Sequence, residues 1–161
     1  MLKDRQIQIL MAMHTLEKSI GELYSLFAEK FPGHSDLWKR LSEDEQGHAE
    51  AVRKLYQISY DGQSVFAEEN IKPEAVQSII DYVKEIHASA TLGKLSAQKA
   101  LGITYDLENS LLEKTIFQHF KATSQFVNIL QVLRKQTKEH AVMTKTEMET
   151  SPQADMQRKA G

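Results

Sequence analysis

The sequence predicts an all-α protein made of two antiparallel helix hairpins joined by a long crossover. Only 7 glycines and 3 prolines occur in 161 residues, and the alternation of apolar and polar residues that marks a β-strand is nowhere sustained. Four segments instead carry apolar residues at steps of three and four, which places these residues on one face of an α-helix. The chain is long enough for one domain with a sizeable core, which we expect over residues 1–145.

The first hairpin is expected to contain two long helices. The first of them extends over about residues 3–30 and ends before Pro32, a residue type that is not tolerated in a helix interior. Ser35 is a favourable N-cap for the next helix, which ends near Ser59, before Gly62. The connection between these helices is only four residues long, so we expect them to run antiparallel.

A crossover of roughly 35 residues separates the two hairpins and is too long for a tight turn. Pro73 is suited to the first turn of a helix, and the amphipathic stretch that follows it turns Ile79, Ile80, Val83 and Ile86 inward. We therefore expect the crossover to contain a short helix of its own.

The second hairpin is expected to begin after Gly93. Ser96 is a favourable N-cap for a helix that extends to about Lys121, and the last helix extends over about residues 124–144. The tail over residues 146–161 is polar and has no apolar face, so we expect it to be disordered and to carry no chemistry.

The apolar stripes of the four long helices are interrupted by polar or metal-binding residues. The stripes are Met13, Glu17, Ile20, Tyr24 and Phe27; Leu41, Glu45, His48, Val52 and Leu55; Leu101, Thr104, Glu108, Leu111 and Thr115; and Phe126, Leu130, Leu133, Thr137 and His140. A buried carboxylate without a partner costs several kcal/mol, and no Lys or Arg lies on these stripes to supply a counter-charge. The inward glutamates therefore need metal ions or protons as partners.

The polar residues of the stripes lie at matching heights in the two hairpins. Glu17 precedes Glu45 by 28 positions and His48 by 31 positions. In the second hairpin, Glu108 precedes His140 by 32 positions. The spacing therefore predicts one site with pseudo-twofold symmetry between the hairpins, in which the Glu-x-x-His pair of the second helix faces the core.

Composition excludes several classes of site and partner. The 20 basic and 22 acidic residues are scattered and give a net charge of −2, so we expect neither a nucleic-acid nor a membrane partner. The absence of Cys excludes disulfides, Fe–S clusters, Cys-ligated zinc and a rubredoxin-type iron centre, which leaves oxygen and nitrogen ligands. No apolar run is long enough to span a membrane and the N-terminal residues do not resemble a signal peptide, so we expect a cytoplasmic protein.

Several motifs form one set when they are taken together. They are Glu17 with Tyr24 seven residues on, Glu45-Gln46-Gly47-His48-Ala49, Ser96-Ala97-Gln98-Lys99-Ala100-Leu101 leading to Asp106-Leu107-Glu108, and His140. Over about residues 5–145 this set resembles the rubrerythrin-type branch of the ferritin-like superfamily. The resemblance implies a ferritin-like four-helix bundle with a di-iron carboxylate site between its helices.

The resemblance also implies a role for each inward ligand. One metal would be bound by Glu17 and His48, and the other by Glu108 and His140. Glu45 would bridge the two metals. Iron is the metal that the resemblance implies, and Mn or Zn would also suit carboxylate and imidazole ligands.

The chain departs from the family pattern at Thr137, where the family has a second bridging Glu. The roles of some neighbouring residues stay open. Tyr24 either hydrogen-bonds a ligand carboxylate or is a core residue, and Asp106 is a reserve ligand in case Glu108 is turned away. Gly47, in the middle of its helix, is a residue that would permit a close approach of helices beside the site.

The function that the resemblance implies is that of an oxidoreductase of the peroxidase or ferroxidase type, acting on O2, peroxide or Fe(II), with a homodimer as its assembly. Because the chain has no Cys, a peroxidase of this kind would take electrons from an external protein donor or from Fe(II). The alternative is a non-catalytic helical binding or assembly module with a degenerate or mononuclear metal site, which Thr137 favours. Iron storage in a hollow shell is a third interpretation that the sequence leaves open.

Overall fold

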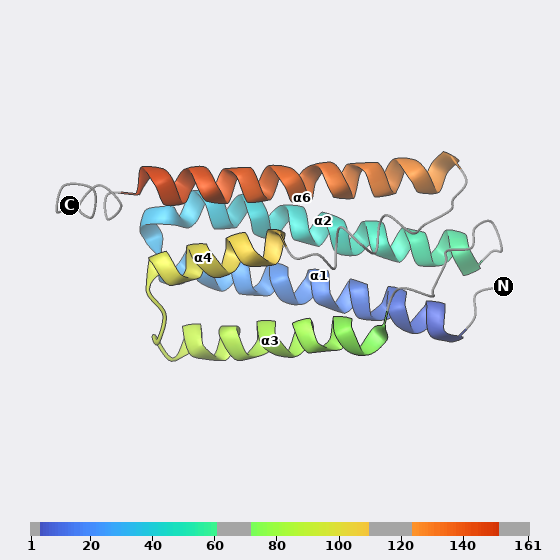
Figure 1. Ribbon diagram of the computed structural model, residues 1–161, viewed down its shortest axis with the longest axis horizontal. Coiled ribbons are helices and arrows are strands. Elements are labelled where there is room, and N and C mark those ends of the chain that lie inside the picture. Colours follow the sequence, from blue (N-terminus) through green and yellow to red (C-terminus); the bar gives the residue numbers. More distant parts are fainter. Residues whose placement is uncertain (1–3, 61–71, 110–123, 152–161) are drawn as a thin grey trace.

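The computed structural model of the protein describes residues 4–60, 72–109 and 124–151. Within these ranges every regular element is a helix, which confirms the predicted all-α class (Figure 1). The elements are α1 (Asp4–Lys30), the 3-10 turn η1 (Pro32–His34), α2 (Ser35–Tyr60), α3 (Pro73–Thr91), α4 (Ala97–Glu108) and α6 (Ser124–Thr150).

The helices α1 and α2 form the predicted antiparallel hairpin (Figure 1). The turn η1 leads directly into α2, so Ser35 already has helical dihedral angles (φ −57°, ψ −39°) and is not an N-cap outside the helix, as the sequence had suggested. The two helices approach closely at Gly21, where a Cβ would lie 3.3 Å from the Cβ of Glu45. At the same height, the Ser42 hydroxyl donates a hydrogen bond of 2.8 Å to the Gly21 carbonyl oxygen.

The expectation that Gly47 permits a close approach of helices is wrong. A Cβ at Gly47 would have no atom within 4 Å outside its own surroundings, because this residue is on the exposed side of α2. Gly21 of α1 has that role instead.

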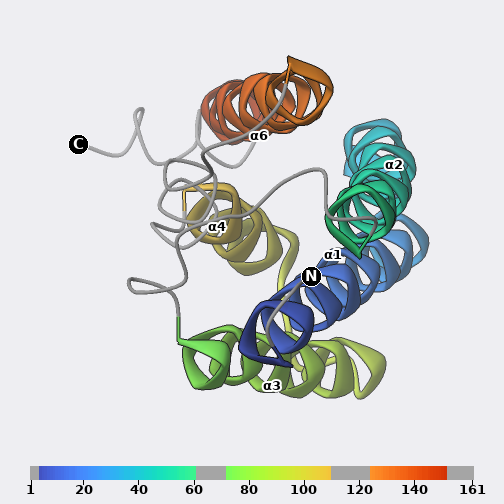
Figure 2. The same cartoon turned by 90° about the vertical axis from the view of Figure 1, so that its right-hand side faces the viewer.

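The helices α4 and α6 form the second antiparallel pair, and α6 also packs against α2 (Figure 2). The crossover contains a helix, as predicted, although α3 is 19 residues long and therefore not short. Pro73 is in its first turn, and α3 packs against α1 through Val76, Ile80 and Val83.

Two predicted boundaries differ from the structure. The helix that was expected to reach Lys121 ends at Glu108, where Asn109 caps it by donating a side-chain hydrogen bond of 3.0 Å to the Tyr105 carbonyl oxygen. The rest of that prediction lies outside the described residues. The last helix does not end near residue 144, since α6 continues to Thr150.

The first part of the predicted disordered tail is therefore helical. Met148 packs against the core, and Glu147 lies 2.6 Å from Nδ1 of His34 at the end of the first hairpin. These contacts give the last turns of α6 a buried side that the apolar pattern alone did not indicate. The domain extends at least to Thr150, and the remainder of the predicted tail lies outside the described residues.

The predicted inward stripes form the core. Every stripe residue whose side chain the structure describes is buried, while Leu111, Thr115 and Phe126 are outside that set. At one end, Phe27 and Trp38 pack with ring centroids 5.2 Å apart, and the Trp38 indole N–H donates a hydrogen bond of 3.0 Å to the hydroxyl of Thr104. Among the described residues, no helix combines the length and apolar character required to cross a membrane.

Candidate metal centre

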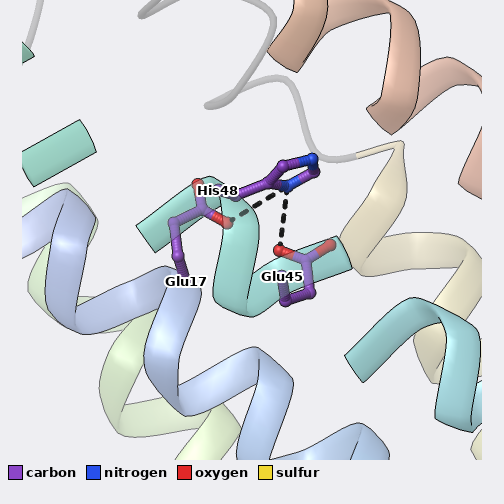
Figure 3. Close-up of side chains that lie close together, drawn as sticks. All are labelled: Glu17, Glu45 and His48. Carbon is purple, nitrogen blue, oxygen red and sulfur yellow. Dashed lines mark hydrogen bonds and ion pairs between the residues drawn. The ribbon is translucent and has the colours of Figure 1, made fainter. Parts of the chain in front are cut away.

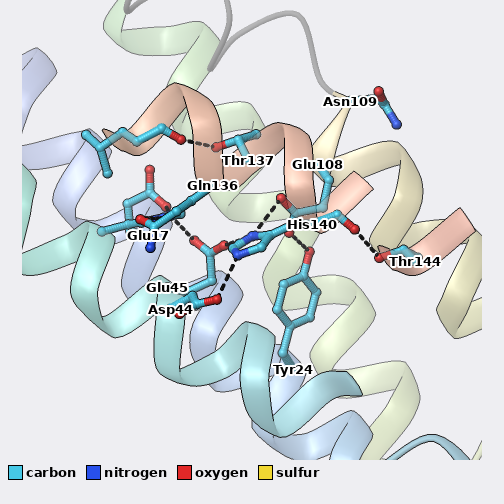
Figure 4. Close-up of polar contacts among 12 residues, drawn as sticks. Glu17, Tyr24, Asp44, Glu45, Glu108, Asn109, Gln136, Thr137, His140 and Thr144 are labelled. Carbon is cyan, nitrogen blue, oxygen red and sulfur yellow. Dashed lines mark hydrogen bonds and ion pairs between the residues drawn. The ribbon is translucent and has the colours of Figure 1, made fainter. Parts of the chain in front are cut away.

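Five buried ionisable side chains from four helices meet in the core (Figures 3 and 4). They are Glu17 of α1, Glu45 and His48 of α2, Glu108 of α4 and His140 of α6, and none is more than 3% exposed. The sequence predicted this set from the stripes and the matched spacing. The structure brings all five together.

The five side chains form two groups that share Glu45. In the first group, Nδ1 of His48 lies 3.2 Å from Oε2 of Glu45 and 3.8 Å from Oε2 of Glu17 (Figure 3). In the second group, Nδ1 of His140 lies 3.2 Å from Oε1 of Glu45 and 3.2 Å from Oε2 of Glu108. Each group offers ligand atoms within 4.8 Å of one another, and each oxygen of Glu45 belongs to one group. This geometry suits a carboxylate that bridges two positions.

The outer nitrogens of the two histidines have partners that the sequence analysis missed. Nε2 of His48 lies 3.0 Å from Oε1 of Gln136, and Nε2 of His140 lies 3.1 Å from Oδ2 of Asp44. An Nε2–H that donates to such an oxygen leaves Nδ1 as the nitrogen that faces the carboxylates. Each partner is four residues before the histidine of its own helix in the sequence, but it contacts the histidine of the other helix, so the pairing depends on how α2 and α6 pack.

The remaining predicted residues differ in their placement. Tyr24 is fully buried, and its hydroxyl donates a hydrogen bond of 2.7 Å to Oε1 of Glu108. Of the two roles left open for Tyr24, the structure therefore supports the hydrogen bond to the carboxylate of a candidate ligand. Thr137 is buried near the centre, but its hydroxyl donates a hydrogen bond of 3.0 Å to the Leu133 carbonyl oxygen of its own helix. Asp106 is exposed, so its reserve role is not supported, because Glu108 already faces the centre.

The pKa values of the carboxyl groups separate because of burial and mutual charge. Burial and the charge of Glu45 raise the pKa of Glu17 to about 8. The same two causes raise the pKa of Glu108 above its usual range. Burial would also raise the pKa of Glu45, but hydrogen bonds with the two histidines outweigh it and hold the pKa of Glu45 well below its usual range.

The pKa values of the two histidines are raised, which keeps both side chains protonated. Burial alone would lower the pKa of His48, but its contacts with Glu17 and Glu45 outweigh burial and raise that pKa to about 11. Contacts with Glu108 and Glu45 raise the pKa of His140 to about 10, also against the effect of burial. Without a metal, Glu45 is therefore an anion between two imidazolium groups near neutral pH, and protons act as the counter-charges.

The residues fit a divalent metal ion by their chemistry. Within the described residues, the ion pairs of the three buried glutamates are made with the two histidines. Oε2 of Glu17 is buried and faces His48 at 3.8 Å but has no hydrogen-bond partner among the described residues, and a bound cation would satisfy it. Carboxylate oxygens and imidazole nitrogens are ligands that Fe(II), Mn(II) and Zn(II) accept. These buried groups could hold a metal ion.

Comparison of the chain with protein-family models, curated proteins and solved structures finds no match. The resemblance to ferritin-like proteins therefore stays a prediction from the sequence motifs.

Proposed function

We propose that the protein is a non-haem di-iron carboxylate protein of the rubrerythrin or ferritin type and an oxidoreductase that acts on O2, peroxide or Fe(II). The observation that carries the proposal is the pair of buried Glu/His groups that share one carboxylate, Glu45. Structural salt bridges also use Glu and His, but they do not need two such groups side by side in a core, one of them with a buried glutamate oxygen that has no hydrogen-bond partner among the described residues.

A ferritin-like four-helix bundle is the architecture we propose for α1, α2, α4 and α6. Two antiparallel pairs and a long crossover between them support it, because the crossover is the connection that distinguishes ferritin-like bundles from simple up-and-down bundles. An inward Glu on α1 and another on α4 face the polar positions of α2 and α6, as such a site requires.

The chain's own residues would bind and orient two metal ions. Glu17 and His48 would hold one ion, Glu108 and His140 the other, and Glu45 would bind both. Fe(II) held by these residues would supply electrons to O2 or peroxide and would itself be oxidised to Fe(III).

Other side chains would keep these ligands in position. Asp44 and Gln136 fix the orientation of the imidazole rings, and the Tyr24 hydroxyl holds one oxygen of Glu108. The burial of all five candidate ligands excludes bulk water from the centre.

Electrons for more than one turnover would come from an external donor or from Fe(II) itself, because the chain has no Cys for a second iron centre. A homodimer is the assembly expected from the resemblance, and size-exclusion chromatography tests it. A dimer would also exclude storage in a hollow shell.

The test of the proposal combines stoichiometry with kinetics. Protein loaded anaerobically with excess Fe(II) and desalted should contain close to two irons per chain by elemental analysis. Mixing it with O2 or peroxide in a stopped-flow instrument should give a transient absorption and iron oxidation faster than in buffer. The matched control is Glu50→Gln, which removes an exposed carboxylate of α2 outside the centre. One iron or none per chain, or oxidation no faster than in buffer, contradicts the proposal.

One observation favours the second candidate, a non-catalytic module with a mononuclear or degenerate site. The Thr137 hydroxyl donates to its own helix, so α6 supplies no second bridging carboxylate. For a module whose site holds no metal, chelation would leave the melting temperature unchanged, whereas a resident metal would raise it by linkage. A chelation experiment at constant pH therefore separates a metal-binding centre from an empty one, and the metal content per chain separates a mononuclear site from a two-metal centre.

A further inference from the structure

The two metal positions of the proposed centre have different surroundings. The His48 position is formed by Glu17, Glu45 and His48, and the His140 position by Glu45, Glu108 and His140. The ligand types are the same, one shared and one unshared glutamate with one imidazole through Nδ1. The groups behind the ligands, in contrast, differ between the two positions.

The first difference is the group behind each imidazole. Asp44, a carboxylate, accepts from Nε2 of His140 at 3.1 Å, while Gln136, a neutral amide, accepts from Nε2 of His48 at 3.0 Å. Both partners lie at nearly the same distance from the outer ring nitrogen. Only the carboxylate adds negative charge and makes the imidazole a stronger electron donor to a metal.

The second difference is the group behind each unshared glutamate. Oε1 of Glu108 accepts a hydrogen bond of 2.7 Å from the Tyr24 hydroxyl, which leaves Oε2 directed at the centre. The centre-facing Oε2 of Glu108 also lies 3.2 Å from Nδ1 of His140, whereas Oε2 of Glu17 lies 3.8 Å from Nδ1 of His48 and has no hydrogen-bond partner among the described residues. A ligand that is already held in place loses less conformational freedom when a metal binds.

From these two differences we infer that the metal positions are inequivalent, the His140 position binding a divalent metal ion tightly and the His48 position binding a second, exchangeable ion more weakly. The inference rests on the proposed function and adds to it the order of loading. Outer partners of metal-binding histidines typically change affinity by about 10- to 100-fold, so we expect the two steps to differ at least tenfold.

The test uses the full chain and Co(II), whose visible spectrum reports the ligands of each step, with Zn(II) competition against a chromophoric chelator. The wild-type protein should bind two ions in two resolved steps. His140→Ala should remove the tight step and His48→Ala the weak one. Circular dichroism and a melting curve for each variant confirm that it is folded.

Two isosteric substitutions then exchange the outer charges without changing a ligand. Asp44→Asn should weaken the tight step by about 10- to 100-fold and leave the weak step nearly unchanged. Gln136→Glu should strengthen the weak step by a similar factor. Each substitution should therefore reduce the difference in affinity between the two steps, Asp44→Asn by weakening the tight step and Gln136→Glu by strengthening the weak one.

The outcomes separate this inference from the proposed function. Two steps of equal affinity in the wild type, or an effect of Asp44→Asn on the weak step, overturn the inference and leave the two-metal centre standing. Binding of no Co(II) or Zn(II) by folded protein overturns both.

Discussion

The two hairpins supply unequal shares of the centre, although their inward residues lie at matching heights. On α2, Glu45 contacts both histidines with a different oxygen for each. Thr137 occupies the corresponding place on α6, and its hydroxyl donates to the Leu133 carbonyl oxygen of the same helix. The comparison indicates that the first hairpin carries Glu45, the carboxylate shared by both groups. Each helix of the second hairpin contributes one candidate ligand, Glu108 from α4 and His140 from α6.

The hairpins also differ as scaffolds. Within the described residues, α1 and α2 are 27 and 26 residues long and approach closely at Gly21, whereas α4 has only 12 residues. The first hairpin also provides Asp44 and Tyr24, which hold His140 and Glu108 of the second. A long, closely packed pair of helices thus positions ligands on both sides of the centre.

The largest effect is expected when the shared carboxylate is removed by Glu45→Gln. Both metals should be lost, and the metal-free protein should be destabilised by about 3–5 kcal/mol, because two buried imidazolium groups lose their anion. Metal content by elemental analysis and urea unfolding at pH 7 measure the two effects.

The matched variant is Glu17→Gln, which removes a carboxylate that serves only the His48 position. It should lose one metal, and it should change metal-free stability much less, because burial already raises the pKa of Glu17 to about 8 and keeps this group protonated at neutral pH. Equal losses of metal and of metal-free stability in the two variants would show that Glu45 has no special role.

The substitution Thr137→Glu should make the second hairpin resemble the first. A further carboxylate at this buried position should destabilise the metal-free protein by several kcal/mol, since it has no cation of its own. It should also increase the gain in melting temperature on adding Zn(II) or Mn(II), because a second bridging ligand becomes available. Melting curves with and without metal measure both.

The isosteric control Thr137→Val should leave the metal-induced gain unchanged, and a Glu variant that behaves like the Val variant would contradict the prediction.

The stability of the metal-free protein should fall as the pH rises from about 5.5 to 10. The pKa values of His48, about 11, and His140, about 10, lie above the ordinary value of 6.5, so their contribution is complete below 6.5 and is lost as the pH rises through 10 to 11. Glu17 acts in the same direction, because its pKa rises from 4.5 to about 8. Urea unfolding with a chelator at pH 5.5, 7.5 and 9 measures the slope.

Two variants sharpen this dependence. Glu17→Gln should remove the part of the slope that lies between pH 4.5 and about 8 and reduce the part above it, because Glu17 also raises the pKa of His48. With saturating Zn(II), the stabilisation by metal should grow with pH, because the metal replaces protons on the same nitrogens. A metal-free stability that rises between pH 5.5 and 9 would contradict the assignment of these protons.

Most of the centre could be predicted because it is encoded by local spacing. Glu17, Glu45, His48, Glu108 and His140 all lie on apolar stripes, and helical periodicity alone turns them inward. Asp44 and Gln136 were missed because their contacts run between α2 and α6, and Asp44, about 30% exposed, does not belong to a stripe. Such cross-helix contacts depend on the packing of the bundle.

The helix ends were predicted less well for a similar reason. No Gly or Pro follows Glu108 to mark the end of α4, and the cap is formed by Asn109, a residue type that is also common within helices and loops. At the end of α6, the contact of Glu147 with His34 joins residues 113 positions apart. Neither feature produces a periodic pattern that a reading along the chain can detect.

The smallest effects are expected at the glycines, and they test whether the close packing of the first hairpin serves the centre. Ala at Gly47 of α2 or at Gly102 of α4 meets open space, so each substitution should stabilise the protein by about 0.5–1 kcal/mol through helix propensity.

At Gly21 the new methyl group would lie 3.3 Å from the Cβ of Glu45, so the helices must shift by a few tenths of an ångström. Gly21→Ala should therefore lose most of this gain and weaken both metal-binding steps together, since Glu45 belongs to both positions. Urea unfolding and Co(II) titration of the three variants decide the point: weakening at only one step would mean that Glu45 does not bridge.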